Sequence, residues 1–326
     1  MKRVLRLILL LVQILLFMIM GATLLNAYIP PKLFVGFNFL SLAFPIVVIL
    51  YSLICFFWIA TWRKRGLVTL FLLILFLLPI ERWGNYSPNT NPKGIKIITY
   101  NTKQDNKSHK ENIIAFLEKE NPDIVLLQES NMKENIDALP YHFHSGLVSI
   151  YSRYKIIGSG KVMDFNDNSF SAYADLRIRG KIVRVLSVYL SPFNLEKDMV
   201  KPTGDLAQNE QKAQSLAGML APNFKKHQYQ VEQIKNFVEQ SPYPVIIGGD
   251  FNSVPNSYEY YHIAKGMKDS FLEVGNGLGT SFHDFKFPIR IDYLFCSKSI
   301  TPSFFKTDRT VHLSDHFPII GYFDIP

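Results

Sequence analysis

The feature that most constrains this chain is an uncharged apolar stretch close to its N-terminus. Leu7–Asn26 is 20 residues long, contains no charged side chain and follows the basic residues Lys2, Arg3 and Arg6. A helix of about 20 apolar residues crosses the ~30 Å hydrocarbon core of a bilayer. A cleavable signal peptide normally has a shorter apolar stretch and then a small-residue cleavage site, and no such site follows here. We therefore expect a membrane-spanning helix over residues 7–26.

Two more apolar runs follow, separated by a second basic cluster. The second run covers about residues 38–60, and the cluster Arg63-Lys64-Arg65 comes just after it. The third run is weaker, because Leu67–Ile80 has only 14 residues and reaches 17 only if it extends to Trp83. Lys and Arg beside membrane spans are retained on the cytoplasmic side. Two spans then join two cytoplasmic clusters, and a third span over residues 67–83 makes a multi-pass membrane protein with the rest of the chain outside the cytoplasm.

The basic character of the chain comes from this N-terminal region. The whole chain has 35 Lys and Arg against 27 Asp and Glu, and residues 1–83 hold eight of the former and one of the latter. That leaves 27 basic and 26 acidic residues in 84–326, so the net charge of +8 divides into +7 and +1. A protein that binds duplex nucleic acid strongly usually carries a pronounced basic surface. The overall charge therefore gives no indication of a nucleic-acid partner.

The remainder of the chain is predicted to form one α/β domain. Residues 84–94 have a turn-forming composition and are expected to be a linker to a domain over 95–326. The apolar runs in that domain predict strands near 95–100, 124–128, 147–152, 170–177, 181–190, 245–248, 291–296 and 317–323, and helices near 109–120 and 205–239. Two blocks of strands and helices around hairpins favour two packed β-sheets flanked by helices, a four-layer α-β-β-α sandwich preceded by an all-α transmembrane region.

Polar side chains follow several of the predicted strands. Asn101, Glu129 and Asp250 each come directly after a mostly apolar run, and Asn252 lies two residues after the last of them. Strand ends are positions from which a rigid sheet presents groups to a cleft. Asn and Asp also favour ordinary turns, so each alone is open to that simpler interpretation. Glu129 is the exception, because glutamate is not a preferred turn residue.

Short motifs at these strand ends and near the C-terminus occur in a recognisable order. They are Thr99-Tyr100-Asn101, Leu127-Gln128-Glu129, Gly249-Asp250-Phe251-Asn252, Arg290-Ile291-Asp292-Tyr293 and Ser314-Asp315-His316-Phe317-Pro318. From about Ile95 onwards the chain resembles the endonuclease/exonuclease/phosphatase family of metal-dependent phosphoesterases. Members of this family include deoxyribonuclease-like enzymes, abasic-site endonucleases, inositol-phosphate phosphatases and sphingomyelinases. The N-terminal region lies outside the catalytic resemblance, although a bacterial subgroup looks similar in having a few spans before such a domain.

The resemblance implies a hard divalent cation, Mg²⁺ or Mn²⁺, as the cofactor. Such ions prefer oxygen ligands and keep several waters, so one or two protein oxygens suffice. Glu129 matches the main ligand and Asn101 supports it. Asp315 has two open interpretations, a second metal contact or a turn-forming residue beside the histidine. No other cofactor is implied.

The same resemblance implies roles for the catalytic residues. Asp250 matches the group that orients and activates the attacking water, and Asn252 can donate a hydrogen bond to a phosphoryl oxygen. His316 is expected to hydrogen-bond or protonate the phosphate group. Asp292 is expected to hold the other imidazole nitrogen and to favour its charged form.

One position departs from the pattern of many family members. They carry a histidine in an Asn-x-His-Leu block at the end of the strand that matches residues 181–190, and this chain has Tyr189 there. Abasic-site endonucleases resemble this chain in having tyrosine at that place. A phenol can donate a hydrogen bond to a phosphate oxygen. We therefore expect Tyr189 to be functional.

These observations predict a membrane-anchored phosphoesterase that uses metal-assisted attack of water on a phosphodiester. Nucleic acid and a lipid headgroup both remain open as the substrate, and the bilayer is the expected partner of the N-terminal helices. The sequence does not indicate protein partners. The alternative is a catalytically silent, membrane-anchored binding module that retains the fold. Loss of Glu129, Asp250, Asn252, Asp292 or His316 would favour this alternative, and all five are present.

Overall fold

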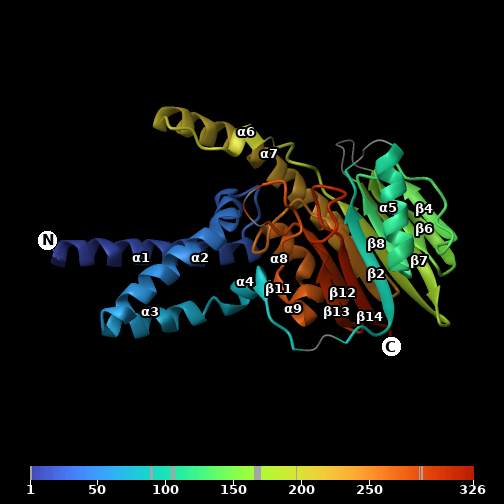
Figure 1. The fold of residues 1–326 in the computed structure, drawn as a ribbon, viewed down its shortest axis with the longest axis horizontal. Helices are drawn as coiled ribbons and strands as arrows, with labels where there is room; N and C mark the ends of the chain where they lie inside the picture. The colour runs from blue at the N-terminus through green and yellow to red at the C-terminus, as the bar shows by residue number, and fades with distance from the viewer. Residues whose placement is uncertain are drawn as a thin grey trace.

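The computed structural model describes residues 2–88, 91–103, 107–164, 170–195, 197–285, 287 and 289–326. It shows a helical N-terminal region that projects from one side of a β-sandwich (Figure 1). The helical region consists of α1 (Lys2–Leu24), the 3-10 turn η1 (Leu25–Ala27), α2 (Gly36–Ala60), α3 (Lys64–Ile74) and α4 (Leu77–Glu81).

Two helices of this region are long and apolar enough to cross a membrane. They cover Arg3–Ala27 and Gly36–Ala60, each 25 residues long, and most of their side chains are not buried inside the protein. A small core of Leu16, Met20, Phe44, Val47, Tyr51 and Phe76 holds the helices together. Large apolar side chains such as Leu7, Leu11 and Leu53 remain more than half exposed. Apolar surface of this extent requires an apolar partner.

The third apolar segment differs from the single helix expected over residues 67–83. It forms α3 and α4, and the chain turns at Leu75 and Phe76 between them. The amide groups of these two residues bond to carbonyls three residues earlier, Leu72 and Leu73, so the last turn of α3 tightens. The segment nevertheless leads the chain back to the sandwich, where the Trp83 carbonyl accepts from Gly279 N.

The sandwich contains two six-stranded mixed sheets. The first has the order β10-β12-β9-β8-β7-β6, with bounds Met267–Asp269, Asp292–Ser297, Val245–Asp250, Lys181–Tyr189, Phe170–Ile178 and Ile156–Asp164. The second has the order β13-β14-β2-β3-β5-β4, with bounds Thr301–Thr307, Ile319–Asp324, Ile95–Asn101, Ile124–Gln128, Val148–Ser152 and Tyr141–Ser145. In each sheet only one pair is parallel: β8 with β9, and β2 with β3.

Helices cover both outer faces, so the predicted four-layer α-β-β-α arrangement is confirmed. The described helices of the sandwich are α5 (Lys107–Glu120), α6 (Lys197–Val200), α7 (Leu206–Glu239), α8 (Tyr258–Ala264) and α9 (Ser270–Val274). The largest core lies between the sheets and includes Ile97 and Leu126 from one sheet and Val185 and Leu294 from the other. Further cores pack α7 and α8 on the first sheet and α5 on the second.

Most predicted elements are present with small shifts at their ends. The expected strand at residues 124–128 coincides with β3, and the expected helix at 205–239 is α7, which begins one residue later. Asp205 caps α7 by accepting from Ala207 N and Gln208 N. Strands β6, β10 and β13 and helices α8 and α9 were not expected from the sequence.

The predicted linker over residues 84–94 is partly built into the sandwich. Gly84–Asn85 forms β1, which pairs with β11 (Gly277–Leu278). The Asn85 amide donates to the carbonyls of Phe271 and Leu272, at 2.9 and 2.8 Å. The start of this segment is therefore fixed to the domain.

Buried hydrogen bonds also join the helical region to the sandwich. Asn38 on α2 donates from Nδ2 to both carboxylate oxygens of Glu259 on α8. Asn256, in the loop before α8, accepts from the Arg82 guanidinium at 2.7 Å. Its backbone carbonyl accepts from Asn26 Nδ2 at 2.9 Å. The two regions are thus docked on each other through the loop and helix that follow β9.

Candidate active site

The predicted site residues converge where the two parallel strand pairs end. Asn101, the last residue of β2, lies opposite Gln128 at the end of β3. Tyr189, the last residue of β8, lies opposite Asp250 at the end of β9. Asp250 also pairs in register with Asp292, the first residue of β12. Since parallel strands present their carboxyl ends at one edge, the topology itself assembles these groups.

The backbone turns sharply at two of the site residues. Glu129 and Asn252 have positive φ angles of 47° and 45°. A positive φ is uncommon for residues other than glycine, above all for a glutamate. Such strain persists where the surrounding structure enforces it, which is frequent at functional sites. Here it lets the chain leave the sheet immediately after β3 and β9.

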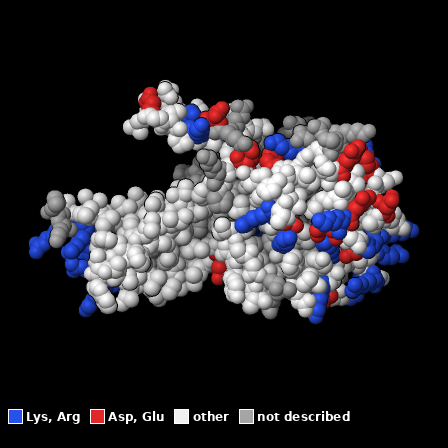
Figure 2. All heavy atoms as spheres, viewed as in Figure 1, with Lys and Arg blue, Asp and Glu red and all other residues white. Residues whose placement is uncertain are grey.

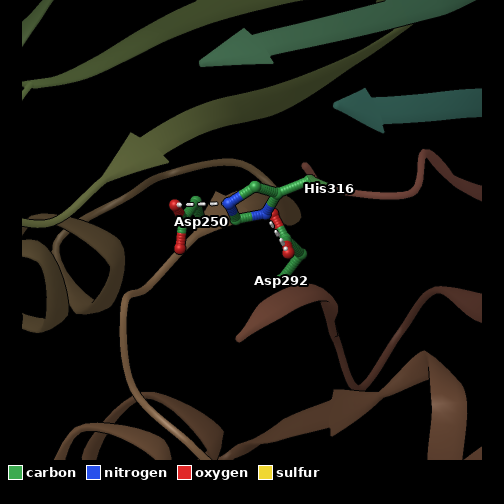
Figure 3. A group of neighbouring side chains, drawn as sticks. All are labelled: Asp250, Asp292 and His316. Atoms are coloured by element: carbon green, nitrogen blue, oxygen red, sulfur yellow. Dashed lines mark hydrogen bonds and ion pairs between the residues drawn. The ribbon is translucent and has the colours of Figure 1, made fainter. Parts of the chain in front are cut away.

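A buried group of two carboxylates and one imidazole forms the centre of the site. His316 Nδ1 lies 2.8 Å from Asp292 Oδ2, and His316 Nε2 lies 3.8 Å from Asp250 Oδ2. Figure 3 shows the imidazole between the two carboxylates. His316 is only 4% exposed, Asp292 2% and Asp250 1%. The Phe282 ring packs on His316 at 4.9 Å between ring centroids and covers it.

Burial and neighbouring charges shift the proton affinities of this group. Burial, together with the charge of Asp292, raises the pKa of Asp250 to about 8. Burial alone would lower the pKa of His316, but the carboxylates of Asp292 and Asp250 outweigh it and raise that pKa to about 10. A carboxyl group able to take up a proton near neutral pH therefore lies beside an imidazole that stays charged.

A second group surrounds the carboxylate of Glu129. Its Oε1 accepts from Asn101 Nδ2 at 3.0 Å and from the Tyr189 hydroxyl at 2.9 Å. Asn101 Nδ2 also donates to Asp250 Oδ2 at 2.9 Å, so it bridges the two groups. Burial and then the Glu129 charge raise the pKa of the Tyr189 phenol well above its usual value, so it remains a donor.

The expected phosphate-binding residues are engaged within the protein. Asn252 Nδ2 donates to the Leu190 carbonyl at 3.0 Å and to Asp250 Oδ2 at 3.3 Å. The Asn252 backbone N–H donates to Asp250 Oδ1 at 2.7 Å, which fixes the orientation of that carboxylate. Of these contacts, the 3.3 Å bond is the longest and is the one a phosphoryl oxygen can replace with the least loss.

Asp315 forms an ion pair with Lys103, a residue that the sequence motifs did not indicate. Its Oδ2 lies 2.6 Å from Lys103 Nζ, and the lysine is about half exposed. Burial opposes ionisation of Asp315, but its bond to Lys103 and the charge of His316 prevail and lower its pKa. Lys103 follows Asn101 by two residues and has a positive φ of 44°. No sequence signal other than this proximity marks it.

Ser281 is a second residue that the motifs missed. Its Oγ accepts from the backbone amides of Ile291, at 3.1 Å, and Asp292, at 3.0 Å. This contact holds the start of β12 and hence the carboxylate that orients His316. The serine lies in a loop without any pattern that would single it out.

The donor set of the site fits a hard divalent cation. Glu129, Asn101 and Asp315 supply side-chain oxygens, which suit Mg²⁺ and Mn²⁺ better than softer metals. In this structure Asn101 directs its amide nitrogen at Glu129, while Oδ1 accepts from Lys103 N at 3.0 Å. Its role as a ligand stays a prediction that requires the amide to turn.

The ligand atoms of Asp250, Asp292 and His316 also lie within 4.8 Å of one another and form a possible metal-binding group. Both imidazole nitrogens face carboxylates, however, and this arrangement favours the imidazolium form. An imidazolium has no lone pair for a metal. The contacts of His316 therefore favour a proton donor at this position.

Comparisons with known proteins agree with this geometry. A family model described as "Endonuclease/Exonuclease/phosphatase family" matches residues 94–316, and one described as a domain of unknown function matches residues 6–83. No curated protein gives a match.

Solved structures with the same fold share little sequence with this chain. A humanized TDP2 of D. rerio has 16% identity and a TM-score of 0.50, with 71% of this chain and 98% of the other covered. An endonuclease/exonuclease/phosphatase from Bacteroides vulgatus has 18% identity and a TM-score of 0.50, with 71% and 99% covered. The human Nocturnin catalytic domain with bound sulfate has 15% identity and a TM-score of 0.50, with 72% and 97% covered.

Proposed function

Because this chain belongs to the endonuclease/exonuclease/phosphatase family, we propose that it is a membrane-anchored hydrolase that cleaves a phosphodiester with the help of Mg²⁺ or Mn²⁺. The observation that carries this proposal is the buried group of Asp250, Asp292 and His316. A binding module has no need of a charged imidazole held between two buried carboxylates, because keeping charges out of water is costly. This group therefore favours turnover over a catalytically silent module.

Each side chain of the site has a separate role in the proposed reaction. Asp250, oriented by Asn252 N, accepts the proton of the attacking water. His316 donates from Nε2 to the phosphoryl group, while Asp292 holds Nδ1 and keeps the ring charged. Asn252 donates to a phosphoryl oxygen in exchange for its longer contact with Asp250. Tyr189 is a further donor at the same edge of the sheet.

Glu129 would hold the metal ion, with Asn101 and Asp315 as additional oxygen donors. The bound ion would supply positive charge that offsets the charge of the phosphoryl oxygens and the leaving oxygen. Tyr189 orients the Glu129 carboxylate through its hydroxyl group. Lys103 adds a second positive charge beside Asp315, at the half-exposed border of the site.

The N-terminal region supports anchoring with the catalytic domain outside the cytoplasm. The helices α1 and α2 run away from the sandwich, and Figure 2 shows Lys and Arg gathered at their far end with little charge in between. Arg3, Arg6, Arg63 and Arg65 lie together at that end. Under the positive-inside rule this end faces the cytoplasm. The sandwich, at the opposite end, would lie outside.

The docking of the two regions favours a lipid headgroup as the substrate. Asn256 follows the catalytic Asn252 by four residues and donates from Nδ2 to the Pro79 carbonyl at 3.1 Å. The loop that carries Asn252 therefore lies against the end of the membrane region. A site held beside a bilayer meets lipid phosphates at a high effective concentration. The catalytic region has a net charge of only +1, which gives no separate support for nucleic acid.

The test is hydrolysis by the purified full-length protein in detergent. We expect metal-dependent release of p-nitrophenol from bis(p-nitrophenyl) phosphate, which EDTA abolishes and Mg²⁺ or Mn²⁺ restores. Phospholipid vesicles and single-stranded and duplex DNA follow as natural substrates. Cleavage of p-nitrophenyl phosphate alone would indicate a phosphatase, and turnover of none of these compounds would favour the binding module.

A further inference from the structure

Two sequence segments bring arginine side chains together at the far end of the helical region. Arg3 and Arg6 belong to α1, whereas Arg63 and Arg65 lie at the start of α3. With Leu7 and Trp58 they line a pocket of about 370 Å³. Figure 2 shows blue atoms at this end of the helical region, next to a stretch of the region that is almost entirely white. The pocket lies at the opposite end of the helices from the catalytic residues.

The residues that line this pocket are suited to an anion. Four of the six are arginines, and none of the described lining residues is acidic. Positive charges that line one pocket repel one another, and an anion bound between them offsets this repulsion. The planar guanidinium group also matches a phosphate with paired hydrogen bonds, which a lysine cannot form. Arg65 lies over the Trp58 ring, with Cζ 5.8 Å from the ring centroid.

An apolar groove lies next to the arginine pocket. It has a volume of about 290 Å³ and runs between α1, α2 and α3, with Leu10, Ile14, Phe17, Val68 and Leu72 among its lining residues. Arg65 lines both the pocket and the groove. A charged pocket beside an apolar groove, with Arg65 in the wall of both, matches the two ends of a phospholipid.

Gln13 provides an independent indication of a ligand in the groove. It lines the groove and is only 2% exposed. Its Oε1 accepts from Trp58 Nε1 at 2.7 Å, but its Nε2 has no hydrogen-bond partner within the described part of the chain. A buried donor left unpaired destabilises a protein, because it has given up its hydrogen bond to water without gaining another. Gln13 lies deeper than the arginines, as the ester carbonyls of a phospholipid lie deeper than its phosphate.

We propose that this end of the helical region binds an anionic phospholipid. The phosphate lies among Arg3, Arg6, Arg63 and Arg65, one acyl chain occupies the groove, and Gln13 donates to an ester carbonyl. The proposal rests on the membrane anchoring inferred above and not on the hydrolytic reaction. The bound lipid is a structural ligand on the face opposite the active site. Basic pockets between spans on the cytoplasmic side are suited to such headgroups.

The experiment compares ligands on delipidated full-length protein in detergent with EDTA present, which prevents hydrolysis. Phosphatidylglycerol, phosphatidylcholine with the same acyl chains, and inorganic phosphate are each titrated while the thermal unfolding midpoint is measured. We expect phosphatidylglycerol to raise the midpoint at a concentration at least tenfold lower than phosphatidylcholine does. Inorganic phosphate should leave it unchanged. If phosphate acts as well as the lipid, or if the two lipids act alike, the proposal is overturned.

Single-residue variants test whether phosphatidylglycerol acts through the arginine pocket. Arg65→Gln should weaken the response to phosphatidylglycerol at least tenfold, and Arg65→Lys should weaken it less because the charge remains. Lys32→Gln is the matched control, since Lys32 is exposed in the loop at the other end of α1 and its loss also removes one charge. An equal loss in Lys32→Gln, or none in Arg65→Gln, would overturn the assignment.

Two further measurements separate this proposal from the proposed function. Arg65→Gln should hydrolyse bis(p-nitrophenyl) phosphate like the unmodified protein, which also shows that its sandwich is folded. His316→Asn should bind phosphatidylglycerol normally while losing hydrolysis. Failure of hydrolysis in all forms would overturn the proposed function, while a selective response to phosphatidylglycerol would still support the lipid site. Release of the protein from membranes by alkaline carbonate would instead refute the anchoring on which both lipid arguments rest.

Discussion

Asn38 on α2 donates from Nδ2 to both carboxylate oxygens of Glu259 on α8, at 3.1 and 2.9 Å, and both side chains are fully buried. Its Oδ1 accepts from Tyr258 N at 2.9 Å. One side chain of the helical region thus satisfies a buried carboxylate and a backbone amide at the start of a helix in the sandwich. His227, on α7, contacts the same carboxylate at 3.3 Å. The pair makes the docking of the two regions specific.

Replacing Asn38 with Ala should destabilise the protein and loosen this docking. The change leaves a buried carboxylate with fewer donors, which costs about 1–3 kcal/mol. The midpoint of unfolding in detergent should fall, and proteases should cut residues 84–94 faster. Ser52→Ala is the control, because within the described part of the chain the Ser52 hydroxyl bonds to Val48 O of its own helix and to no residue of the sandwich. If both variants unfold and are cut alike, the pair has no role in docking.

Replacing Asp250 with Asn should abolish most hydrolysis. An amide cannot accept the proton of the attacking water, and general-base catalysis contributes roughly 10²–10⁴-fold. We expect kcat for bis(p-nitrophenyl) phosphate to fall by about that factor. Asp137→Asn, an exposed position, serves as the control for loss of one carboxylate. Activity of Asp250→Asn within twofold of the unmodified protein would show that the site has been misassigned.

Replacing Asp292 with Asn should move the alkaline limit of activity to lower pH. Burial lowers the pKa of His316, but the charges of Asp292 and Asp250 outweigh it and raise that pKa to about 10; the charged imidazole is the active form. Activity that needs this form is present below that pKa and is lost as the pH rises through it. Without the Asp292 charge the pKa of His316 falls, so the loss begins at lower pH. A profile of kcat/KM from pH 6 to 11 measures this, and an unchanged alkaline limit would contradict the role of His316.

Replacing Tyr189 with Phe should weaken activation by metal. The Tyr189 hydroxyl orients the Glu129 carboxylate, and loss of a partner that orients a metal ligand costs about 10–100-fold in affinity or activity. We expect the Mg²⁺ concentration for half-maximal activity to rise, with kcat at saturating Mg²⁺ less affected. Tyr154→Phe, on the β5–β6 turn, is the control. A fall in kcat alone would mean that Tyr189 acts on the phosphate and not through Glu129.

Replacing Gly249 with Ala should destabilise the sandwich strongly. Gly249 has a φ of 153°, and an added Cβ would overlap the Val188 carbonyl of the neighbouring strand. The backbone would have to move beside Asp250, and we expect a loss of about 3 kcal/mol or more, with less activity. Gly218→Ala should instead stabilise α7 by up to about 1 kcal/mol, since no heavy atom lies within 4 Å of its added Cβ. Chemical denaturation of both variants makes the comparison.

The site residues at strand ends could be predicted because buried strands appear in the sequence as apolar runs. Asn101, Glu129 and Asp250 each follow such a run, and the two parallel pairs place their ends together. Asp292 and His316 are 24 residues apart, and only the sheet topology and the motif order join them.

Other features depend on contacts that no local pattern records. Strand β6 is an edge strand in which Gly158, Gly160 and the polar residues between and after them interrupt the apolar residues, so it has no long apolar run. Helix α8 is buried between the first sheet, on which Tyr260 and Ile263 pack, and the helical region, more than 200 residues earlier, which contacts Glu259. The third apolar segment reads as one span by composition, yet the chain turns at Leu75 and Phe76. Lys103 lies in the loop after β2, two residues beyond Asn101. The sequence of so short a segment does not show in which direction the loop carries the lysine side chain.

The pairing of β1 with β11 fixes the chain between α4 and the sandwich, so the membrane-anchored enzyme proposed above has no flexible linker at this point. An enzyme joined to its membrane anchor by a long flexible linker samples a large volume and reaches substrates at many distances from the membrane. A domain joined to a membrane anchor without a flexible linker stays at one distance from the membrane and in one orientation. It reaches new substrate only by lateral diffusion in the plane of the membrane. Its turnover would then follow the number of substrate molecules per unit area of bilayer, and dilution of the surrounding medium would leave that turnover unchanged.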